Sequence, residues 1–177
     1  MNSVTGFLMR RLKLKVNESK SAVARPVERK FLGFSFSNNK EPKRRIAPKA
    51  VLRCKQKIRE LTRRTRGISL EQMLKELAAY LRGWKSYFGF CQTPSPLKAL
   101  DEWIRRRLRS MIWKQWKRGK QRYGKLRHLG IGRDLAAQTA GSPHGPWHLA
   151  NSPALAIALS IAYFDSLGLP RLFDANA

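Results

Sequence analysis

Basic and aromatic side chains alternate along two stretches of the sequence, and this pattern carries the clearest chemistry of the chain. The first stretch is residues 82–88, RGWKSYF, and the second is residues 103–118, where Trp103, Trp113 and Trp116 stand among arginines and lysines. Guanidinium and ammonium groups neutralise phosphates, and aromatic faces stack on unpaired bases. The pattern predicts binding to a polyanion and suits RNA, but it indicates no preference for a base sequence.

The candidate RNA-binding residues are mainly cations of the helices predicted below. Trp113 and Trp116 are equally compatible with contact to RNA and with burial, and Trp116 is taken as a candidate. The full set of candidates is Arg53, Lys57, Arg63, Arg64, Arg82, Lys85, Arg105, Arg106, Arg109, Lys114, Trp116, Lys117, Arg118, Arg122 and Arg127.

The net charge indicates the same class of partner. The chain has 177 residues, with 37 Lys and Arg against 11 Asp and Glu, which gives a formal net charge of +26. All of this excess lies in residues 1–135, because Arg171 is the one basic residue after them. A chain this basic repels itself unless a polyanion screens it, which argues against an ordinary metabolic enzyme. Nucleic acid is the expected partner, and an anionic membrane surface is the less common alternative.

The sequence contains no pattern typical of a catalytic or metal site. The acidic residues are scattered, and the pair Asp101-Glu102 falls in the first turn of a predicted helix, where carboxylates interact with the helix dipole. The three histidines lack companion cysteines, and Cys54 and Cys91 do not form a CxxC pair. We therefore expect no catalytic residue, no metal ion and no cofactor.

Three helices are predicted to position the candidate cations. Apolar residues recur at spacings of three and four within residues 48–66, 70–88 and 95–118, so each segment has an apolar stripe and basic residues on its other faces. A core shared by these stripes would leave the cations at the surface.

The ends of these helices are marked by specific residues. Pro48 suits a first helical position, and Gly67 is predicted to end the first helix. Ser69 and Gln72 form a capping-box pair at the start of the second helix.

The remaining segments are shorter. Residues 12–16 and 31–36 have the pattern of strands, and residues 119–132 indicate a loop with a short helix around Leu126. Helices are predicted over residues 134–139 and 154–167. The fold class is therefore mainly α, with a short N-terminal β segment followed by helices.

With these segments in view, the chain resembles the C-terminal part of a group II intron reverse transcriptase/maturase. The most specific match is residues 81–88, LRGWKSYF, with the structural motif Gly83, Trp84, Tyr87 and Phe88. Trp84 and Phe88 are predicted to be buried, and Gly83 to allow close approach of another backbone. The other matching blocks, in family order, are residues 12–21 and 31–34 of the palm, the basic helices from residue 48, residues 103–109 and 113–117, and residues 159–164 and 167–170.

The resemblance implies a division of the chain into three parts. Residues 1–45 would be the remnant of a reverse-transcriptase palm, residues 46–67 a thumb-like helix and linker, and residues 68–177 the maturase-specific domain, called domain X. In the family, the thumb and domain X bind intron RNA and help it reach its splicing-competent fold, while the RNA performs the chemistry.

The resemblance does not extend to polymerase activity. The family holds two metal ions with a Tyr-Ala-Asp-Asp turn and an upstream aspartate, whereas this sequence has no Asp-Asp pair and its first aspartate is Asp101. We therefore expect an RNA-binding maturase module that is not an enzyme on its own. The alternatives are half of a split RNA-directed DNA polymerase, joined by an N-terminal reverse-transcriptase fragment, and a truncated remnant without function.

The location of the protein is predicted from its apolar segments. The N-terminus lacks the apolar stretch of a signal peptide, and the longest apolar run, residues 154–164, is too short to span a bilayer. We expect a cytoplasmic protein that does not contact a membrane, with structured RNA, above all group II intron RNA, as its partner.

Overall fold

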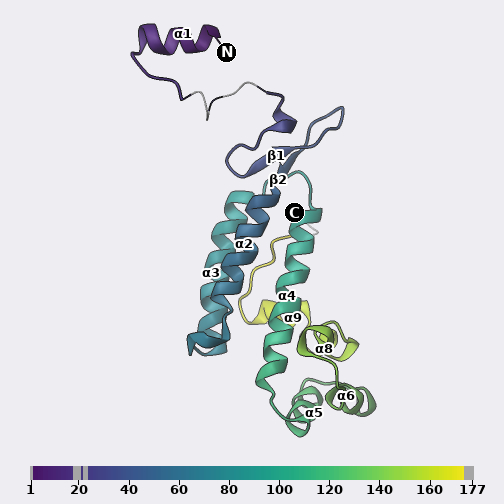
Figure 1. The fold of residues 1–177 in the computed structure, drawn as a ribbon. Helices are drawn as coiled ribbons and strands as arrows, with labels where there is room; N and C mark the ends of the chain where they lie inside the picture. Colours follow the sequence, from purple (N-terminus) through teal and green to yellow (C-terminus); the bar gives the residue numbers. More distant parts are fainter. Residues whose placement is uncertain (1, 18–20, 22–23, 174–177) are drawn as a thin grey trace.

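The fold is a group of helices preceded by a small antiparallel sheet (Figure 1). The computed structural model describes residues 2–17, 21 and 24–173, apart from the side chains of Asn2 and Arg64. The predicted mainly α fold with a short N-terminal β segment is confirmed. The elements are α1 (Asn2–Arg11), η1 (Pro26–Glu28), β1 (Phe34–Phe36), β2 (Arg44–Ile46), α2 (Pro48–Leu61), η2 (Arg64–Arg66), α3 (Leu70–Phe88), α4 (Ser95–Gln115), α5 (Gly119–His128), α6 (Arg133–Ala140), α7 (Pro146–Leu149), α8 (Pro153–Ala158) and α9 (Ile161–Ser166).

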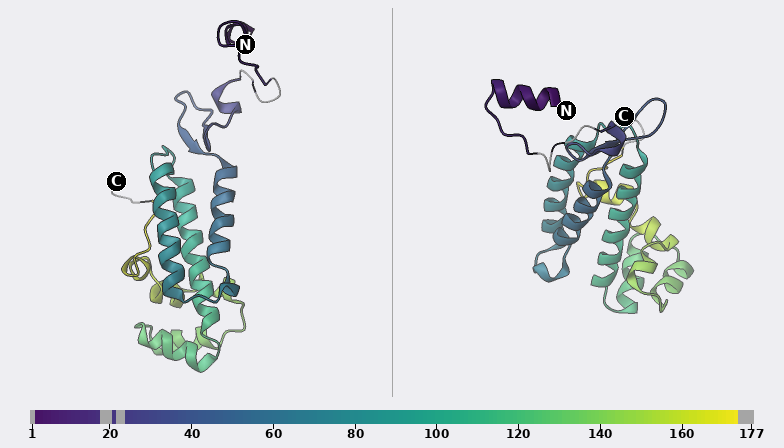
Figure 2. Two further views of the ribbon diagram at one scale, coloured as in Figure 1. Left: turned by 90° about the vertical axis from the view of Figure 1, so that its left-hand side faces the viewer. Right: turned by 45° about the horizontal axis from the view of Figure 1, so that its top comes forward.

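Helices α2, α3 and α4 lie side by side and share one hydrophobic core (Figures 1 and 2). Ile58 of α2, Leu77 and Leu81 of α3, and Ile104 and Leu108 of α4 are at most 1% exposed. The predicted apolar stripes of all three helices are confirmed. Burial of each such side chain contributes about 1.5–3 kcal/mol, so this core dominates the stability of the helical part.

The ends of the long helices follow the local sequence closely. Pro48 occupies the first turn of α2, and the Ser69 hydroxyl accepts a hydrogen bond from the Gln72 N–H at 3.1 Å. A full capping box also needs a hydrogen bond from the Ser69 backbone N–H to the Gln72 side chain. This part of the prediction is wrong, because the Gln72 side chain is turned to Glu76, to which it donates a hydrogen bond. The prediction that Gly67 ends the first helix is also wrong. Helix α2 ends at Leu61, and Gly67, with φ 66°, ends η2.

Helices α5 to α9 gather beside the C-terminal half of α4 (Figure 1). The predicted loop over residues 119–132 is corrected, because residues 119–128 form α5, which buries Leu126. The predicted helix over residues 154–167 is two helices, α8 and α9. Ser160 separates them, and its hydroxyl accepts a hydrogen bond from the Tyr163 N–H and caps α9.

The sheet has two short strands in the described part of the chain. In β1 and β2, Phe34 lies opposite Ile46 and Phe36 lies opposite Arg44. The second predicted strand is shorter than expected because Leu32 and Gly33 have positive φ values, so β1 begins only at Phe34. A Cβ at Gly33 would lie 3.1 Å from the Phe88 ring, so glycine also allows close packing there.

The first predicted strand, residues 12–16, is wrong. These residues have no regular structure, and the side chains of Leu12 and Leu14 are more than half exposed. Their alternation of apolar and basic residues fits a strand, but a strand forms only when another strand bonds to it. Strand β1 is paired with β2, and residues 12–17 have no strand partner in the part of the chain that the structure describes.

The segment after α9 returns along α4 and is held by a buried carboxylate. Asp101, 9% exposed, accepts hydrogen bonds from the backbone N–H groups of Leu172 and Phe173, both at 2.9 Å to Oδ2. Its Oδ1 accepts a hydrogen bond from the Arg105 guanidinium at 2.8 Å. Asp101 therefore joins the last described residues to the core rather than acting only on the helix dipole.

Two further observations concern reactivity and membranes. Burial raises the pKa of the Cys54 thiol to about 11, so this cysteine stays protonated and behaves as a small apolar residue. None of the helices within the described residues combines the length and the apolar character that crossing a bilayer requires.

Candidate nucleic-acid interface

A groove rich in tryptophan and cations lies between α2, α4 and α7. Residues 103, 106, 107, 110 and 114 follow helical spacing along one face of α4, and residues 55, 59 and 63 follow it from α2 into the loop beyond. We call this surface the tryptophan groove and define it by Lys55, Arg59, Arg63, Trp103, Arg106, Arg107, Arg109, Lys114 and Trp147.

One end of the tryptophan groove is built around Trp103. The Lys55 ammonium and the Arg59 guanidinium each lie 5.4 Å from the centre of its ring, and the Arg107 guanidinium lies 5.9 Å from it. Arg107 is fixed by a 2.6 Å hydrogen bond from its Nε to the Thr62 hydroxyl. Burial lowers the pKa of Arg107, and the nearby charge of Arg59 lowers it further. All three cations therefore lie near one ring, and none of them forms an ion pair with a carboxylate of the described residues.

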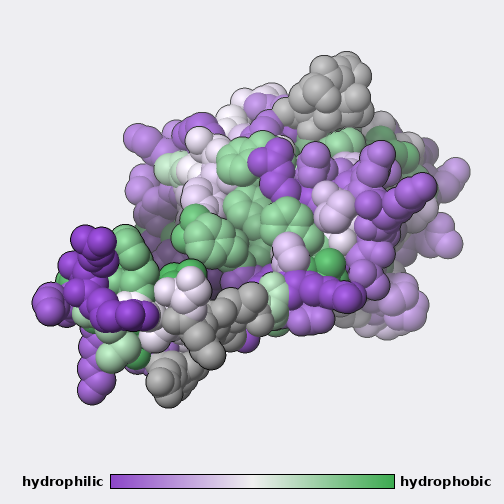
Figure 3. All heavy atoms as spheres, turned by 90° about the horizontal axis from the view of Figure 1, so that it is seen from above, coloured by the Kyte–Doolittle hydropathy of each residue, from purple (hydrophilic) through white to green (hydrophobic). Residues whose placement is uncertain are grey.

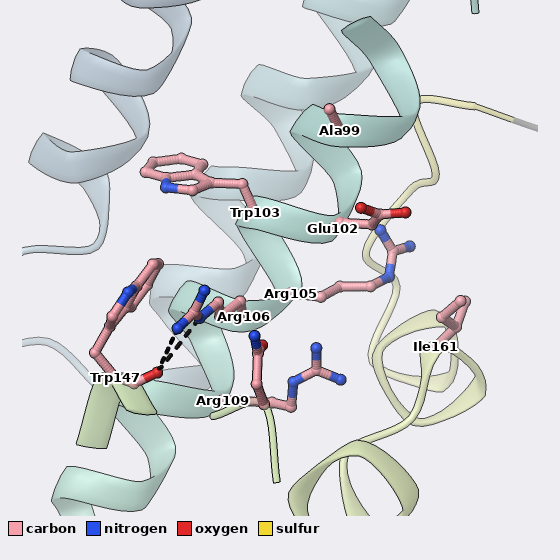
Figure 4. Close-up of a pocket in the computed structure, with 9 residues that line it drawn as sticks. Ala99, Glu102, Trp103, Arg105, Arg106, Arg109, Trp147 and Ile161 are labelled. Atoms are coloured by element: carbon pink, nitrogen blue, oxygen red, sulfur yellow. Dashed lines mark hydrogen bonds between the residues drawn. The ribbon is translucent and has the colours of Figure 1, made fainter. Parts of the chain in front are cut away.

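The other end of the tryptophan groove is built around Trp147 of α7. The Arg106 guanidinium lies 4.3 Å from the centre of the indole ring and donates to the Trp147 carbonyl from Nε at 3.3 Å and from Nη2 at 3.1 Å (Figure 4). Trp147 is nevertheless 42% exposed. The arginine therefore orients an aromatic side chain that remains open to solvent.

Trp147 lines two cavities. The larger, about 470 Å³, is lined by Ala99, Glu102, Trp103, Arg105, Arg106, Arg109, Trp147, Asn151 and Ile161 (Figure 4). The smaller, about 200 Å³, is lined by Thr62, Arg63, Arg107, Ser110, Met111, Lys114 and Trp147. Both cavities combine an indole ring with guanidinium or ammonium groups, and such groups are chemically suited to stack on a base and to pair with a phosphate.

Within the described residues, the cations that define the groove form no ion pair. Over the described residues, the ion pairs are Lys57–Glu60, Arg66–Glu76, Arg105–Asp101, Arg105–Asp165 and Arg171–Asp165, and none of them includes a cation that defines the groove. Glu102 contributes one carboxylate to the larger cavity. Arg109, one of these cations, is partly buried beside Arg105 and Arg106. Positive charge gathered in this way attracts an external polyanion.

Four of the predicted RNA-binding residues meet in this groove: Arg63, Arg106, Arg109 and Lys114. The prediction for Arg105 is corrected, because its side chain is 5% exposed and pairs with Asp101 at 2.8 Å and with Asp165 at 3.7 Å. An arginine held in this way supports the core and is not free to neutralise a phosphate.

The prediction for Trp116 is also corrected. Trp116 is 9% exposed, Trp113 is fully buried, and their rings pack edge to face at 5.8 Å. The Arg122 guanidinium lies 4.8 Å from the centre of the Trp113 ring and donates to the Trp116 carbonyl at 2.8 Å. These tryptophans join α4 to α5 in the core, so they do not offer a face to a base.

The remaining predicted residues are dispersed over other surfaces. Arg53 and Lys57 are exposed on α2, on the opposite side of its buried stripe from Lys55 and Arg59. Arg82 is exposed and Lys85 is partly buried on α3, while Lys117, Arg118 and Arg127 are exposed around α5. Arg127 donates to the Ile131 carbonyl at 2.7 Å. The side chain of Arg64 lies outside the described part of the chain.

The structural motif within residues 81–88 is only partly as predicted. Trp84 and Phe88 are both 8% exposed, which confirms their place in the core. The Tyr87 hydroxyl donates to the Leu32 carbonyl at 2.9 Å and so ties α3 to the segment before β1. The prediction for Gly83 is wrong, because nothing lies within 4 Å of the position that a Cβ would take there.

Several residues of the groove were not predicted as RNA-binding residues: Lys55, Arg59, Trp103, Arg107 and Trp147. Helical spacing from Arg63 and Lys114 back along α2 and α4 would have found the first four. Trp147 could not be found in this way, because only the packing of α7 on α4 brings it beside Arg106.

The fold and the groove define a helical module with a cationic, aromatic surface, and comparison with known families assigns part of it. Residues 51–130 match the model of the family described as group II intron, maturase-specific domain. The match spans nearly all of α2 and the whole of α3, α4 and α5. This part of the chain is therefore a group II intron maturase-specific domain, as the resemblance predicted. No curated protein matches the chain.

The match also bears on how the chain is divided. It begins at residue 51, before the predicted boundary at residue 68, and α2 shares its core with α3 and α4. The division into palm, thumb and domain X stays a prediction.

Proposed function

We propose that this protein binds group II intron RNA through the tryptophan groove and assists the folding and splicing of that RNA, without a polymerase site of its own. The observation that carries the proposal is a surface where at least five cations surround two indole rings without carboxylate partners among the described residues. The maturase-specific domain at residues 51–130 supports the identity of the RNA.

The proposed action is electrostatic and needs no catalytic group in the protein. A folded ribozyme brings phosphates close together, and a rigid array of guanidinium and ammonium groups relieves their repulsion. Packing of α2 and α4 on a common core fixes the spacing of this array before RNA arrives, so little ordering is required on binding. The RNA would perform the splicing chemistry, and the protein would stabilise the competent fold.

The proposal that the chain alone is not an enzyme rests on the use of its carboxylates. Asp101 pairs with the buried Arg105, and the partly exposed Asp165 and Glu76 pair with Arg105 and Arg66. Pairing of this kind supports structure, whereas polymerase metal ions require open carboxylates grouped at one site. The wider proposal includes a cytoplasmic location, where the protein would meet its RNA.

The test is binding to a group II intron RNA, compared with duplex DNA of similar length over a series of salt concentrations. If roughly six phosphates are contacted, the logarithm of the affinity should fall with the logarithm of the salt concentration with a slope of about −5. Preference for the intron RNA at moderate salt, with faster splicing of that RNA, supports the proposal. Equal affinity for any duplex DNA contradicts it.

One observation favours a second candidate function, half of a split RNA-directed DNA polymerase. Apolar side chains are exposed near the sheet and the end of α3, where Phe31, Leu32, Tyr87 and Phe90 are 45–73% exposed, and Figure 3 shows apolar surface on this side of the molecule. Such a patch suits contact with another protein. The DNA upstream of the gene separates the two: an open frame that encodes Tyr-Ala-Asp-Asp favours the split enzyme, and unrelated sequence favours the maturase module.

The third alternative, a remnant without function, is tested by folding. The shared core of α2, α3 and α4 predicts a cooperative thermal transition of the isolated chain with a helix-rich circular dichroism spectrum. A broad transition without cooperativity would favour the remnant.

A further inference from the structure

The larger cavity of the tryptophan groove is lined by Arg109, a partly buried arginine whose positive charge has no ion-pair partner among the described residues. Arg109 is partly buried, its Nε is inaccessible to water, and this atom has no hydrogen-bond partner within the described structure. Arg105 and Arg106 lie within one turn of it on α4. Burial and these two neighbouring charges lower the pKa of Arg109. A guanidinium under these conditions is stabilised most by an anion that enters the cavity.

Arg106 lines the same cavity, with its guanidinium turned toward Trp147, while that of Arg109 lies on the side away from Trp147 (Figure 4). The hydrogen bonds of Arg106 go to the Trp147 carbonyl, which is neutral, so they orient the guanidinium without cancelling its charge. Arg105 differs, because Asp101 and Asp165 neutralise it. The cavity therefore contains two guanidinium groups, those of Arg106 and Arg109, whose charge is available to a ligand (Figure 4).

On the side of the cavity away from Arg109 the lining is aromatic, and the Arg106 guanidinium lies there, 4.3 Å from the centre of the Trp147 ring. Trp103 and Trp147 both line the cavity, and Trp147 is 42% exposed. An indole ring can stack on a base because every base has a π-face, and such stacking is tolerant of the base sequence. The volume of about 470 Å³ lies within the range of about 300–1,000 Å³ that is usual for cavities holding small organic ligands.

We propose that this cavity accepts a single unpaired nucleotide of the bound RNA, with its phosphate at Arg106 and Arg109 and its base against the wall formed by Trp103 and Trp147. A nucleotide inside a continuous duplex cannot enter, because its base is stacked between its neighbours and paired across the helix. The protein would therefore select RNA that presents an unpaired nucleotide in a bulge or loop. This inference rests on the proposed function, since it specifies which part of the RNA the groove recognises.

The test compares a fully paired RNA hairpin with the same hairpin carrying one extra unpaired nucleotide, by fluorescence anisotropy with the full chain. We expect the bulged hairpin to bind about tenfold more tightly, which is the effect of one good stacking contact. Trp147→Ala should remove most of this preference.

Arg109→Met gives a readout that a purely structural residue would not give. It should abolish most of the preference for the bulged hairpin while leaving the melting temperature of the free protein unchanged or higher, because it removes a partly buried, unpaired charge. Arg53→Gln is the matched control: it removes a cation from the other side of α2, so it should change the affinity for each hairpin by less than threefold and leave the preference for the bulged hairpin unchanged.

The outcomes separate this inference from the proposed function. Equal binding of the two hairpins by the unmodified protein, or loss of affinity for both to the same extent in Arg109→Met, overturns the nucleotide cavity and leaves the general RNA-binding role standing. Failure of the protein to bind either hairpin or group II intron RNA overturns both. A marked fall in the melting temperature of Arg109→Met would also overturn it, since Arg109 would then serve the fold.

Discussion

Two faces of helix α4 place adjacent arginines in opposite environments. Arg105 is turned inward, where Asp101 and Asp165 neutralise it and the backbone of residues 172 and 173 bonds to the same Asp101 carboxylate. Arg106 and Arg107 are turned toward the tryptophan groove, where they lie over indole rings. The inner arginine stabilises the fold, and the outer arginines supply charge to a ligand. Net charge alone does not distinguish these roles.

The largest expected effect comes from breaking the inner arrangement. Asp101→Ala leaves the buried Arg105 charge without its closest partner and removes the acceptor for two backbone N–H groups. Loss of one partner of a buried ion pair typically costs about 3–5 kcal/mol. We expect the free energy of unfolding, measured by urea titration, to fall by that order. A double variant with Arg105→Met should recover part of the loss, and a full loss in the double variant would show that the backbone contacts dominate.

Removal of charge from the outer face should instead reduce RNA binding. Arg63→Gln with Lys114→Gln takes two exposed cations from the smaller cavity. If both contact phosphates, the salt dependence of the binding constant should become shallower by about 0.9 for each, and the affinity should fall about tenfold at moderate salt. The free energy of unfolding should change by less than about 0.5 kcal/mol, as is usual at exposed sites. An unchanged salt dependence would place the RNA on another face.

A smaller effect is expected when charge is kept and geometry is lost. Arg106→Lys retains the positive charge but cannot donate twice to the Trp147 carbonyl while covering the ring. The orientation of Trp147 should become less defined, and affinity for intron RNA should fall about three- to fivefold with the salt dependence unchanged. Loss of affinity with a shallower salt dependence would mean that the lysine no longer reaches its phosphate, so the loss would not be due to the orientation of Trp147 alone.

The smallest effect is expected on the other side of α2. Arg53→Gln with Lys57→Gln removes two cations that were predicted to bind RNA but lie away from the groove. Lys57 is already 3.6 Å from Glu60. We expect less than a threefold change in the affinity for intron RNA, measured in parallel with the groove variants. A loss of affinity as large as that expected for Arg63→Gln with Lys114→Gln would mean that the RNA also contacts this side of α2.

The helical core was predictable because its signal is local and periodic. Spacings of three and four placed Ile58, Leu81 and Leu108 on buried stripes, and Ser69 marked the start of α3. The N-terminal strand over residues 12–16 was predicted from an equally regular pattern and is wrong. A helix bonds within its own segment, whereas a strand depends on a partner elsewhere in the chain.

The sequence by itself determined the polycationic character of this protein, its mainly helical fold and its resemblance to a maturase. Each of these depends on composition, on spacing along one segment or on ordered motifs. The tertiary structure decided which cations are available. It buried Arg105 beside Asp165, which is 60 positions away, and it brought Trp147 of α7 to Arg106 of α4. Adjacent arginines on one helix differ by about 100° in direction, so only the packing of the other helices determines which of them meets a carboxylate and which meets solvent.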